Sequence, residues 1–343
     1  MLKSRIAKLF TIAIISISMV IGLYFYSSVA KNRKNDFVRE FPPHLITADT
    51  IKSIANSDLY IAGSNGKFVY LSSKKSKNTL LRFDLQTLDS DTNKIRALKD
   101  FNVYDDAEVQ VESENIFLTQ GFAGNIRSGM LKDLILTKTT QIFPFYSVVS
   151  ITDTSYVIRY INKSNKNVLA IYSTQNRLVS EKNISTKQGD EIFSNDGILL
   201  KTPDKRIAFV YYYSNNFIVT DQNLNESYKA KTIDTNTIAK IKVKKIRSTG
   251  DLTMSAPPLI VNKEACANND HLFIRSGLKA DNQVPEEWSN SSTIDVYNLK
   301  NGNYEFSFYL LDLGKDKLVS FKVYNKTLVA LYHNVIYTFK LNF

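Results

Sequence analysis

Short apolar runs separated by polar turns fill most of the chain from Asp58 onward. Within the runs, apolar residues alternate with polar ones or are mainly β-branched and aromatic, and Asn, Ser, Asp, Lys and Gly separate one run from the next. This pattern is typical of β-strands, because side chains alternate between the two faces of a strand and tight turns favour those separating residues. The sequence therefore predicts an all-β domain.

The runs form sets of three consecutive strands, and six such sets can be found. Their first strands are expected at residues 58–64, 107–113, 147–153, 197–203, 259–265 and 319–325. The sets recur at intervals that scatter around the size of a propeller blade, roughly 40 to 50 residues. We therefore predict a six-bladed β-propeller. A β-sandwich or an open array of strands is the alternative.

Fourth strands complete most of these sets. We expect them at residues 93–101, 177–184, 239–246 and 304–312. The last set has no fourth strand of its own, because the chain stops at Phe343. An unpaired edge strand invites aggregation, so residues 45–55 are expected to pair with the last strand and close the ring.

The N-terminal segment has a different pattern, because Leu9 to Ala30 carries no charge. The first 18 residues of this run would span about 27 Å as a helix, close to the thickness of a bilayer core. We predict that residues 1–30 are a transmembrane signal-anchor helix, that 31–44 are a linker and that 45–343 form an extracytoplasmic, periplasmic-side propeller domain. A cleaved signal peptide ending at Ala30 is the alternative.

Composition and charge further restrict the class of protein to which the chain can belong. The chain has 343 residues, of which 43% are hydrophobic, enough for a sizeable core. Cys266 is the sole cysteine, so an intrachain disulfide is excluded. The net charge of +11 could attract acidic partners, or could be a solvated basic surface. Because export is expected, nucleic acid is not predicted as a partner.

Motifs that carry chemistry are missing from the sequence. The three histidines lack the spacing of a zinc site, and the GxSxG, GxxxxGK[ST] and GxGxxG patterns do not occur. We therefore predict no catalytic residues, no metal site and no cofactor.

The C-terminal half resembles uncharacterised, membrane-tethered six-bladed β-propellers of Bacteroidetes, which have a TolB-like or NHL-like general shape. The resemblance covers roughly residues 190 to 343. It rests on SNDGILLKTPDKRIAFVYYYSNNFIVTDQNL, on TIDTNTIAKIKVKKIRSTGDLTMSAPPLIVNKEA with the later HLFIRSGL, and on STIDVYNLKNGNYEFSFYLLD. The family has no assigned catalytic residues. The resemblance implies the fold and the tether, and it implies nothing about the ligand.

Three long connections point to a binding face. They are residues 121–132, 248–258 and 278–292, and in a propeller all three are expected on one side of the ring. Together they contain the candidate binding residues, a mixture of apolar and charged side chains typical of a binding patch: Arg127, Met130, Met254, Pro257, Glu286, Glu287 and Trp288. Alternatively, Trp288 only fixes its own loop.

These observations favour a non-catalytic cell-envelope protein. We expect a binding or scaffold module that attaches to the membrane through its N-terminal helix and holds a protein, peptide or glycan partner on one propeller face. The alternative is an envelope hydrolase or lyase that acts in the propeller channel. Two converging carboxylates in the channel, or a histidine there with a shifted pKa, would favour the enzyme.

Overall fold

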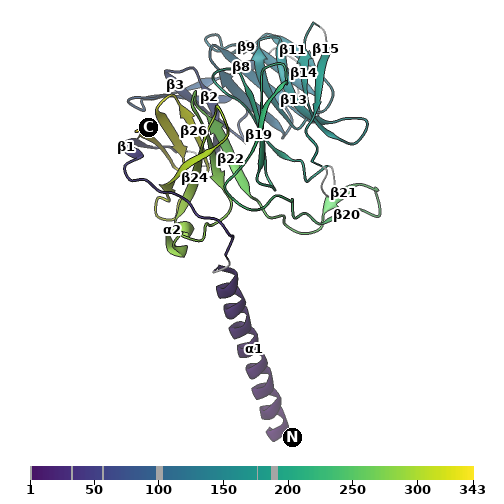
Figure 1. Cartoon of the computed structure of the whole chain (residues 1–343), viewed down its shortest axis with the longest axis vertical. Helices are drawn as coiled ribbons and strands as arrows, with labels where there is room; N and C mark the ends of the chain where they lie inside the picture. Colours follow the sequence, from purple (N-terminus) through teal and green to yellow (C-terminus); the bar gives the residue numbers. More distant parts are fainter. Residues whose placement is uncertain (1, 32–33, 56–57, 98–102, 176, 187–191) are drawn as a thin grey trace.

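Strands dominate the computed structural model, which describes all residues except 1, 32–33, 56–57, 98–102, 176 and 187–191. A long helix, α1 (Leu2–Lys31), precedes the strands, and a short helix, α2 (Pro285–Ser289), lies late in the chain. The strands form a ring of sheets, and α1 projects away from one side of it (Figure 1). The fold is thus mostly β and propeller-like, with an N-terminal helix, as the sequence predicts.

Six four-stranded antiparallel units make up the ring among the described residues, and we number them in chain order. Unit 1 contains β2 (Leu59–Ser64), β3 (Phe68–Ser73), β4 (Thr79–Asp84) and β5 (Ser90–Lys94); unit 2 contains β7 (Ala107–Glu112), β8 (Asn115–Gln120), β9 (Asn125–Met130) and β11 (Lys138–Gln141); unit 3 contains β12 (Ser147–Thr152), β13 (Ser155–Ile161), β14 (Asn167–Ser173) and β15 (Arg177–Asn183). Unit 4 contains β16 (Gly197–Lys201), β17 (Ile207–Tyr211), β18 (Asn216–Thr220) and β19 (Glu226–Lys231); unit 5 contains β22 (Asn262–Ala267), β23 (His271–Ser276), β24 (Ser291–Asn298) and β25 (Tyr304–Leu311); unit 6 contains β26 (Ser320–Tyr324), β27 (Thr327–Leu331), β28 (Val335–Leu341) and β1 (Ile46–Ser53).

The ring closes by pairing the two ends of the chain. β1 lies antiparallel to β28, with Ile46 opposite Leu341 and Ser53 opposite Val335. The Nζ atom of Lys340 lies 3.1 Å from Oδ1 of Asp49 across this pair. The N-terminal residues 46–53 thus supply the fourth strand of unit 6, which confirms the predicted closure.

The hydrophobic core lies between the units. Six of the seven clusters of buried side chains in the described structure draw their members from two neighbouring units around the ring, and the seventh joins Phe37 to Val261 and Leu278. One example is the contact between units 6 and 1, where Val329 and Ile336 pack with Val69 and Leu71. Burial of apolar surface between the units therefore holds the ring together.

Units 1 and 2 are joined more closely than the others, because their innermost strands β2 and β7 pair in parallel at Gly63 and Val111. A Cβ atom at position 63 would lie 1.8 Å from the carbonyl oxygen of Val111, and the φ of Gly63 is +146°. Only glycine permits this approach and this backbone conformation. The pairing merges the two units into one eight-stranded sheet.

Unit 2 differs from the prediction. Residues 121–132 were expected to be a long connection, but β9 occupies Asn125–Met130 within them and pairs with β8. The prediction is wrong because β9 has few apolar residues and includes Gly129, which lowers its strand signal. A Cβ at Gly129 would lie 1.9 Å from the carbonyl oxygen of Ile135, in the short strand β10 (Ile135–Leu136), which pairs with β6 (Arg96–Ala97).

Unit 4 also differs from the prediction. Its fourth strand is β19, whereas residues 239–246 were expected in that position. Part of the expected segment forms β20 (Val243–Lys245), which pairs only with β21 (Leu252–Met254) in a separate hairpin. The alternation of Lys with Ile and Val in this segment does indicate a strand, but both faces of the strand are exposed. The prediction for 93–101 is met only partly, since β5 ends at Lys94 and residues 98–101 lie outside the described part.

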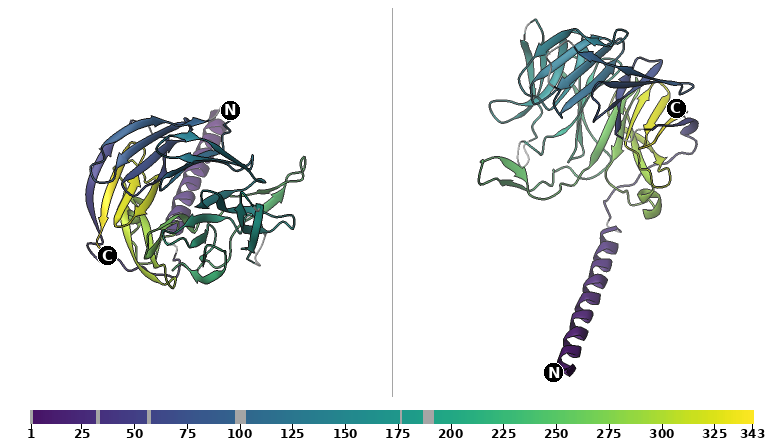
Figure 2. Two further views of the ribbon diagram at one scale, coloured as in Figure 1. Left: turned by 90° about the horizontal axis from the view of Figure 1, so that it is seen from above. Right: turned by 180° about the vertical axis from the view of Figure 1, so that it is seen from behind.

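Strand direction alternates within each unit, so the connections fall on two rims of the ring. We call the rim with the first-to-second strand turns the far rim. The other rim, with the second-to-third connections and the crossings to the next unit, is the tether rim, because α1 leaves the body there. Both views of the ring place α2 and the β20–β21 hairpin on the same side as α1 (Figures 1 and 2).

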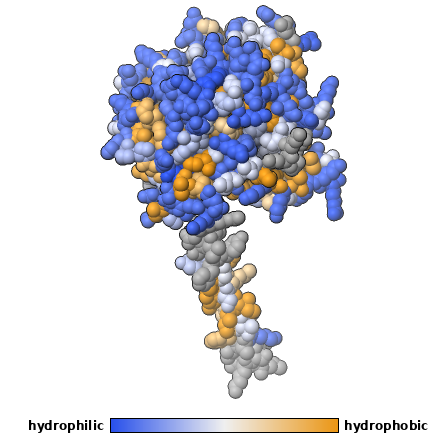
Figure 3. Space-filling view, in the orientation of Figure 1, coloured by the Kyte–Doolittle hydropathy of each residue, from blue (hydrophilic) through white to orange (hydrophobic). Residues whose placement is uncertain are grey.

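The α1 helix stands apart from the ring and exposes large apolar side chains between Phe10 and Tyr24. In the space-filling view this helix carries a column of hydrophobic side chains (Figure 3). Residues 1–30 were predicted to form a transmembrane anchor. Taken over the described residues alone, the structure has no helix that is both long enough and apolar enough to cross a membrane.

Candidate functional site

A pocket on the tether rim contains Trp288, the residue expected to anchor a partner. The pocket has a volume of about 790 Å³ and lies between α2, the segment before β22 and the residues that follow α1. Trp288 is half-buried and is flanked there by the apolar side chains of Leu259, Leu278 and Pro285. Charged groups border this apolar wall, namely Lys34, Lys240, Lys279, Asp36 and Glu286.

The chain folds locally to hold Trp288 in this place. Pro285 begins the single turn of α2, where a proline is tolerated because the first helical N–H groups lack intrahelical partners. The backbone N–H of Trp288 donates to the carbonyl oxygen of Val284, at 3.0 Å. The Nζ atom of Lys263 lies 6.0 Å from the centre of the indole ring. The indole ring of Trp288 therefore lies near the ammonium group of Lys263 and also lines the pocket.

The residues after α1 form one wall of the pocket. The backbone N–H of Asn35 donates to Oδ1 of Asp281 at 2.7 Å, and its side-chain amide donates to the carbonyl oxygen of Lys279 at 2.8 Å. On the other side, the Thr235 hydroxyl donates to the carbonyl oxygen of Asn35 at 2.9 Å. These contacts bridge the loops that precede β20 and β24, so the segment after α1 is bound to the ring.

The other predicted site residues are distributed differently. Glu286 lines the pocket with Trp288, and Glu287 lies beside it on α2 without lining the pocket. Met254 ends β21, and Pro257 follows it in the connection to β22. Arg127 lies within β9 opposite Leu118 and Thr139, and Met130 ends the same strand. The pocket thus brings together two of the seven candidates and none from residues 121–132.

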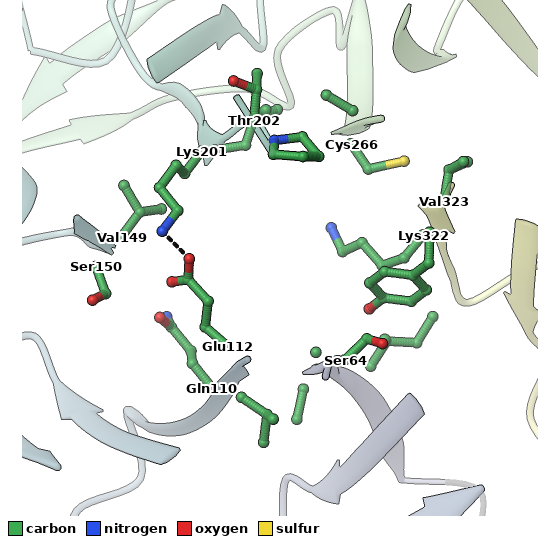
Figure 4. Close-up of a pocket in the computed structure, with 18 of the residues that line it drawn as sticks. Ser64, Gln110, Glu112, Val149, Ser150, Lys201, Thr202, Cys266, Lys322 and Val323 are labelled. Carbon is green, nitrogen blue, oxygen red and sulfur yellow. Dashed lines mark ion pairs between the residues drawn. The ribbon is translucent and has the colours of Figure 1, made fainter. Parts of the chain in front are cut away.

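A second pocket, about 470 Å³ in volume, occupies the centre of the ring. The innermost strands of all six units contribute to it, and it extends to the far rim, where Gly66, Pro203 and Asn325 line it. Figure 4 shows Lys201 of β16 and Glu112 of β7 pointing toward one another inside it, with Lys322 on the opposite wall.

The ion pair between Lys201 Nζ and Glu112 Oε1 is the main charged contact of this channel pocket. Burial and the nearby Lys205 ammonium lower the pKa of Lys201 to about 8, whereas the Glu112 carboxylate favours the charged form. Cys266 also lines the pocket, but burial raises the pKa of its thiol to about 12. A thiol with so high a pKa is a poor nucleophile near neutral pH.

Neither of the two features named above as favouring an enzyme is found in the described lining of the channel pocket. Of its described lining residues, the acidic ones are Glu108 and Glu112. They lie four residues apart on the same strand, which separates them by about 13 Å along it, at roughly 3.3 Å per residue. The described lining contains no histidine. Two converging carboxylates are therefore not found there.

Sequence reasoning missed both Lys201 and Arg39. Lys201 falls near the end of a predicted first strand. First strands line the channel, so the position of Lys201 in the sequence could have indicated a channel residue. Arg39 lay in the expected linker and is instead fully buried against Asp295. No local pattern distinguishes Arg39, because its partner lies more than 250 residues away.

Comparison with known proteins supports only the fold. No family model and no curated protein sequence matches the chain. Among solved structures, a protein of Bacteroides fragilis designated as exported has a TM-score of 0.52 at 8% identity, over 90% of this chain and 98% of that chain. Virginiamycin B lyase from Staphylococcus aureus has a TM-score of 0.48 at 12% identity, over 86% and 99% of the two chains. The WD40 domain of Neurospora crassa Pan2 has a TM-score of 0.46 at 6% identity, over 89% and 98%.

Proposed function

We propose that the protein is a non-catalytic binding module of the cell envelope, a six-bladed propeller that α1 tethers to a membrane and that holds a protein, peptide or glycan partner. The pocket around Trp288 carries this proposal. Its volume of about 790 Å³ lies within the range of ligand sites, roughly 300 to 1,000 Å³. Its apolar wall with a charged border is typical of sites that hold one end of a larger amphipathic partner.

The membrane tether in this proposal is inferred from the apolar composition of α1. The run from Leu9 to Ala30 has no charged residue, and large apolar side chains are exposed all round the described part of the helix. For example, Ile14, Ile15 and Ile17 are each about 60% exposed. A helix that is apolar on every face is stable only when something apolar covers it. Lys3, Arg5 and Lys8 before the run favour a cytoplasmic N-terminus, which would place the ring outside the cytoplasm.

The partner class follows from the side chains present. An indole can stack on the apolar face of a sugar or pack against an apolar peptide side chain. The nearby Lys240 and Lys279 can bind a carboxylate, and Asp36 and Glu286 can bind an ammonium group. A short peptide segment or an acidic glycan offers both kinds of group.

Trp288 is the only tryptophan in the chain, so its fluorescence reports on this pocket alone. The full chain in detergent is titrated with panels of short peptides and oligosaccharides, and the emission of Trp288 is recorded. Saturable shifts in emission for one class of compound support the proposal. If no peptide or glycan changes the emission, while compounds of either class bind with the same affinity to the protein and to its Trp288→Ala variant, the pocket is not the binding site.

The second candidate function is an envelope hydrolase or lyase in the channel, and Lys201 is the observation that favours it. A lysine whose pKa is lowered to about 8 is suited to general base chemistry near neutral pH. Incubation of any bound ligand with the protein, followed by mass spectrometry, separates the two functions. A binding module returns the ligand unchanged, whereas an enzyme returns products, and Lys201→Met would abolish their formation.

A further inference from the structure

The β20–β21 hairpin lies outside the six units of the ring. Residues 242–252 are all exposed, and within the described structure the two strands pair only with each other. A hairpin of two short strands is marginal in water unless something packs against it. The hairpin therefore lacks a partner within the described part of the ring.

The hairpin and the residues beside it carry mostly positive charge. The segment from 240 to 260 has five basic residues, Lys240, Lys242, Lys244, Lys245 and Arg247, and a single acidic one, Asp251. Among the ion pairs found in the described structure, none includes any of these five basic side chains. The segment is thus free to attract an anionic surface.

Its apolar side chains are exposed as well. Val243 faces Met254 across the hairpin, and Lys245 faces Leu252, so that Val243, Leu252 and Met254 lie together with Lys245 on one face of the two-stranded ribbon. Val243 is 38% exposed and Leu252 is 44% exposed. Ile246 in the turn of the hairpin, and Leu259 and Ile260 in the connection to β22, are exposed apolar residues as well. A basic segment with an apolar face is the composition of peptides that lie at a lipid interface.

The position of the hairpin sets which surface it can reach. It lies on the tether rim, the side from which α1 projects (Figures 1 and 2). The uncharged run ends at Ala30 and the first hydrogen bonds to the ring are made by Asn35. Five residues of chain extend at most about 18 Å, at roughly 3.6 Å each. A membrane that contains α1 would therefore lie close to this rim.

We infer that the β20–β21 hairpin and the adjoining residues 255–260 bind the headgroup region of an anionic bilayer, as a second membrane contact beside α1. This inference rests on the proposed tether. Attraction between basic side chains and anionic lipid falls off within a Debye length, about 8 Å at physiological ionic strength. The short connection from α1 holds the rim near the bilayer, and the contact fixes the tilt of the ring against it. The far rim and its channel mouth then face away from the membrane.

The test uses the full chain in lipid vesicles. A bimane fluorophore is attached through Lys244→Cys on the hairpin or, as the matched control, through Lys326→Cys on the far rim. Both positions are exposed, and the native Cys266 is buried. The vesicles contain phosphatidylcholine alone or phosphatidylcholine with phosphatidylglycerol, and each contains a lipid with a nitroxide on its headgroup. Flotation on a density gradient first shows whether the protein associates with the vesicles.

The inference expects severalfold stronger nitroxide quenching at position 244 than at 326 on phosphatidylglycerol vesicles, and less on phosphatidylcholine alone. With the label at 244, the triple variant Lys242→Glu, Lys245→Glu, Arg247→Glu should lose this strong quenching on phosphatidylglycerol vesicles. The matched triple variant on the far rim, Lys67→Glu, Lys205→Glu, Lys326→Glu, also labelled at 244, should keep it.

If the chain floats but position 244 is quenched no more than 326, the hairpin contact is wrong and the tether stands. If the chain floats only with phosphatidylglycerol and only with the hairpin charges intact, the contact stands and the spanning tether is wrong. A chain that floats with neither vesicle overturns both.

Discussion

The guanidinium of Arg39 forms a two-point ion pair with the carboxylate of Asp295, with Nε at 2.6 Å from Oδ1 and Nη2 at 2.9 Å from Oδ2. The Arg39 side chain is fully buried, and it also donates to the carbonyl oxygen of Leu278 and to Oε1 of Gln283. Asp295 lies in the middle of β24, so this pair fixes the segment after α1 to unit 5. The segment that follows α1 and the Trp288 pocket are therefore built on the same support.

Replacing one partner of this pair should be costly. Arg39→Ala leaves Asp295 buried without its counter-charge, and such a loss destabilises a protein by about 3–5 kcal/mol. The double variant Arg39→Met, Asp295→Leu should cost less than either single change, because neither charge of the pair then remains buried without the other. The free energy of unfolding is measured by urea denaturation of the detergent-solubilised chain. The exposed pair of Lys340 with Asp49 is the control, and Lys340→Ala should cost at most about 1 kcal/mol. An equal, small cost for Arg39→Ala would contradict this account.

Ring closure gives a second prediction. Deleting residues 46–53 removes the strand that covers β28 and should lower the melting temperature of the whole ring by roughly 10 °C or more, since each kcal/mol lost shifts it by about 2–4 °C. The matched control deletes residues 243–254. The ends of that hairpin are already joined by a 2.7 Å hydrogen bond between the N–H of Ser255 and the carbonyl oxygen of Lys242, so a short turn can replace it. The control should melt within a few degrees of the intact chain. Similar melting of the two deletion variants would refute closure by β1.

Much of the fold could be predicted because strands that are buried on both faces have a strong hydrophobic pattern in the sequence. The second strands, such as β17, are buried on both faces and appear in the sequence as continuous apolar runs. The outer strands carry a weaker one, since β19 has the sequence ESYKAK with mostly exposed side chains. That weakness allowed residues 239–246 to be taken for the fourth strand of unit 4. The long connection at residues 278–292 could be predicted from the sequence, whereas the contacts of Arg39 and Lys201 join residues that are distant in sequence.

The channel lysine should make stability depend on pH. Unfolded Lys201 releases its proton near the usual value of about 10.4, whereas its folded pKa is about 8. Between these values the unfolded chain binds more protons than the folded one, so stability from this group rises as the pH increases from 8 to about 10. Lys201→Met removes the group, and the difference in unfolding free energy between the two proteins should change over this window. A difference that stays constant from pH 8 to 10 would show that the ion pair with Glu112 keeps Lys201 charged.

Gly129 offers a local test of the corrected unit 2. A Cβ atom there would collide with the carbonyl oxygen of Ile135, a backbone atom that cannot move away easily. Gly129→Ala should therefore destabilise the protein by about 2 kcal/mol or more, which is typical of overpacking in a close-packed region. Urea denaturation measures the change. A neutral effect would mean that β9 and β10 do not cross as closely as described.

The most direct test of the binding function is the effect of Trp288→Ala on the affinity for the peptide or glycan selected by the fluorescence titration, measured by calorimetry on the full chain. As the main apolar contact of the pocket, Trp288 should contribute about 2 kcal/mol or more, which corresponds to a loss of affinity of roughly thirty-fold, while the melting temperature stays unchanged. Lys201→Met in the channel serves as the matched control and should bind the ligand normally. Unchanged affinity in Trp288→Ala together with a large loss in Lys201→Met would contradict the account and move the binding site to the channel.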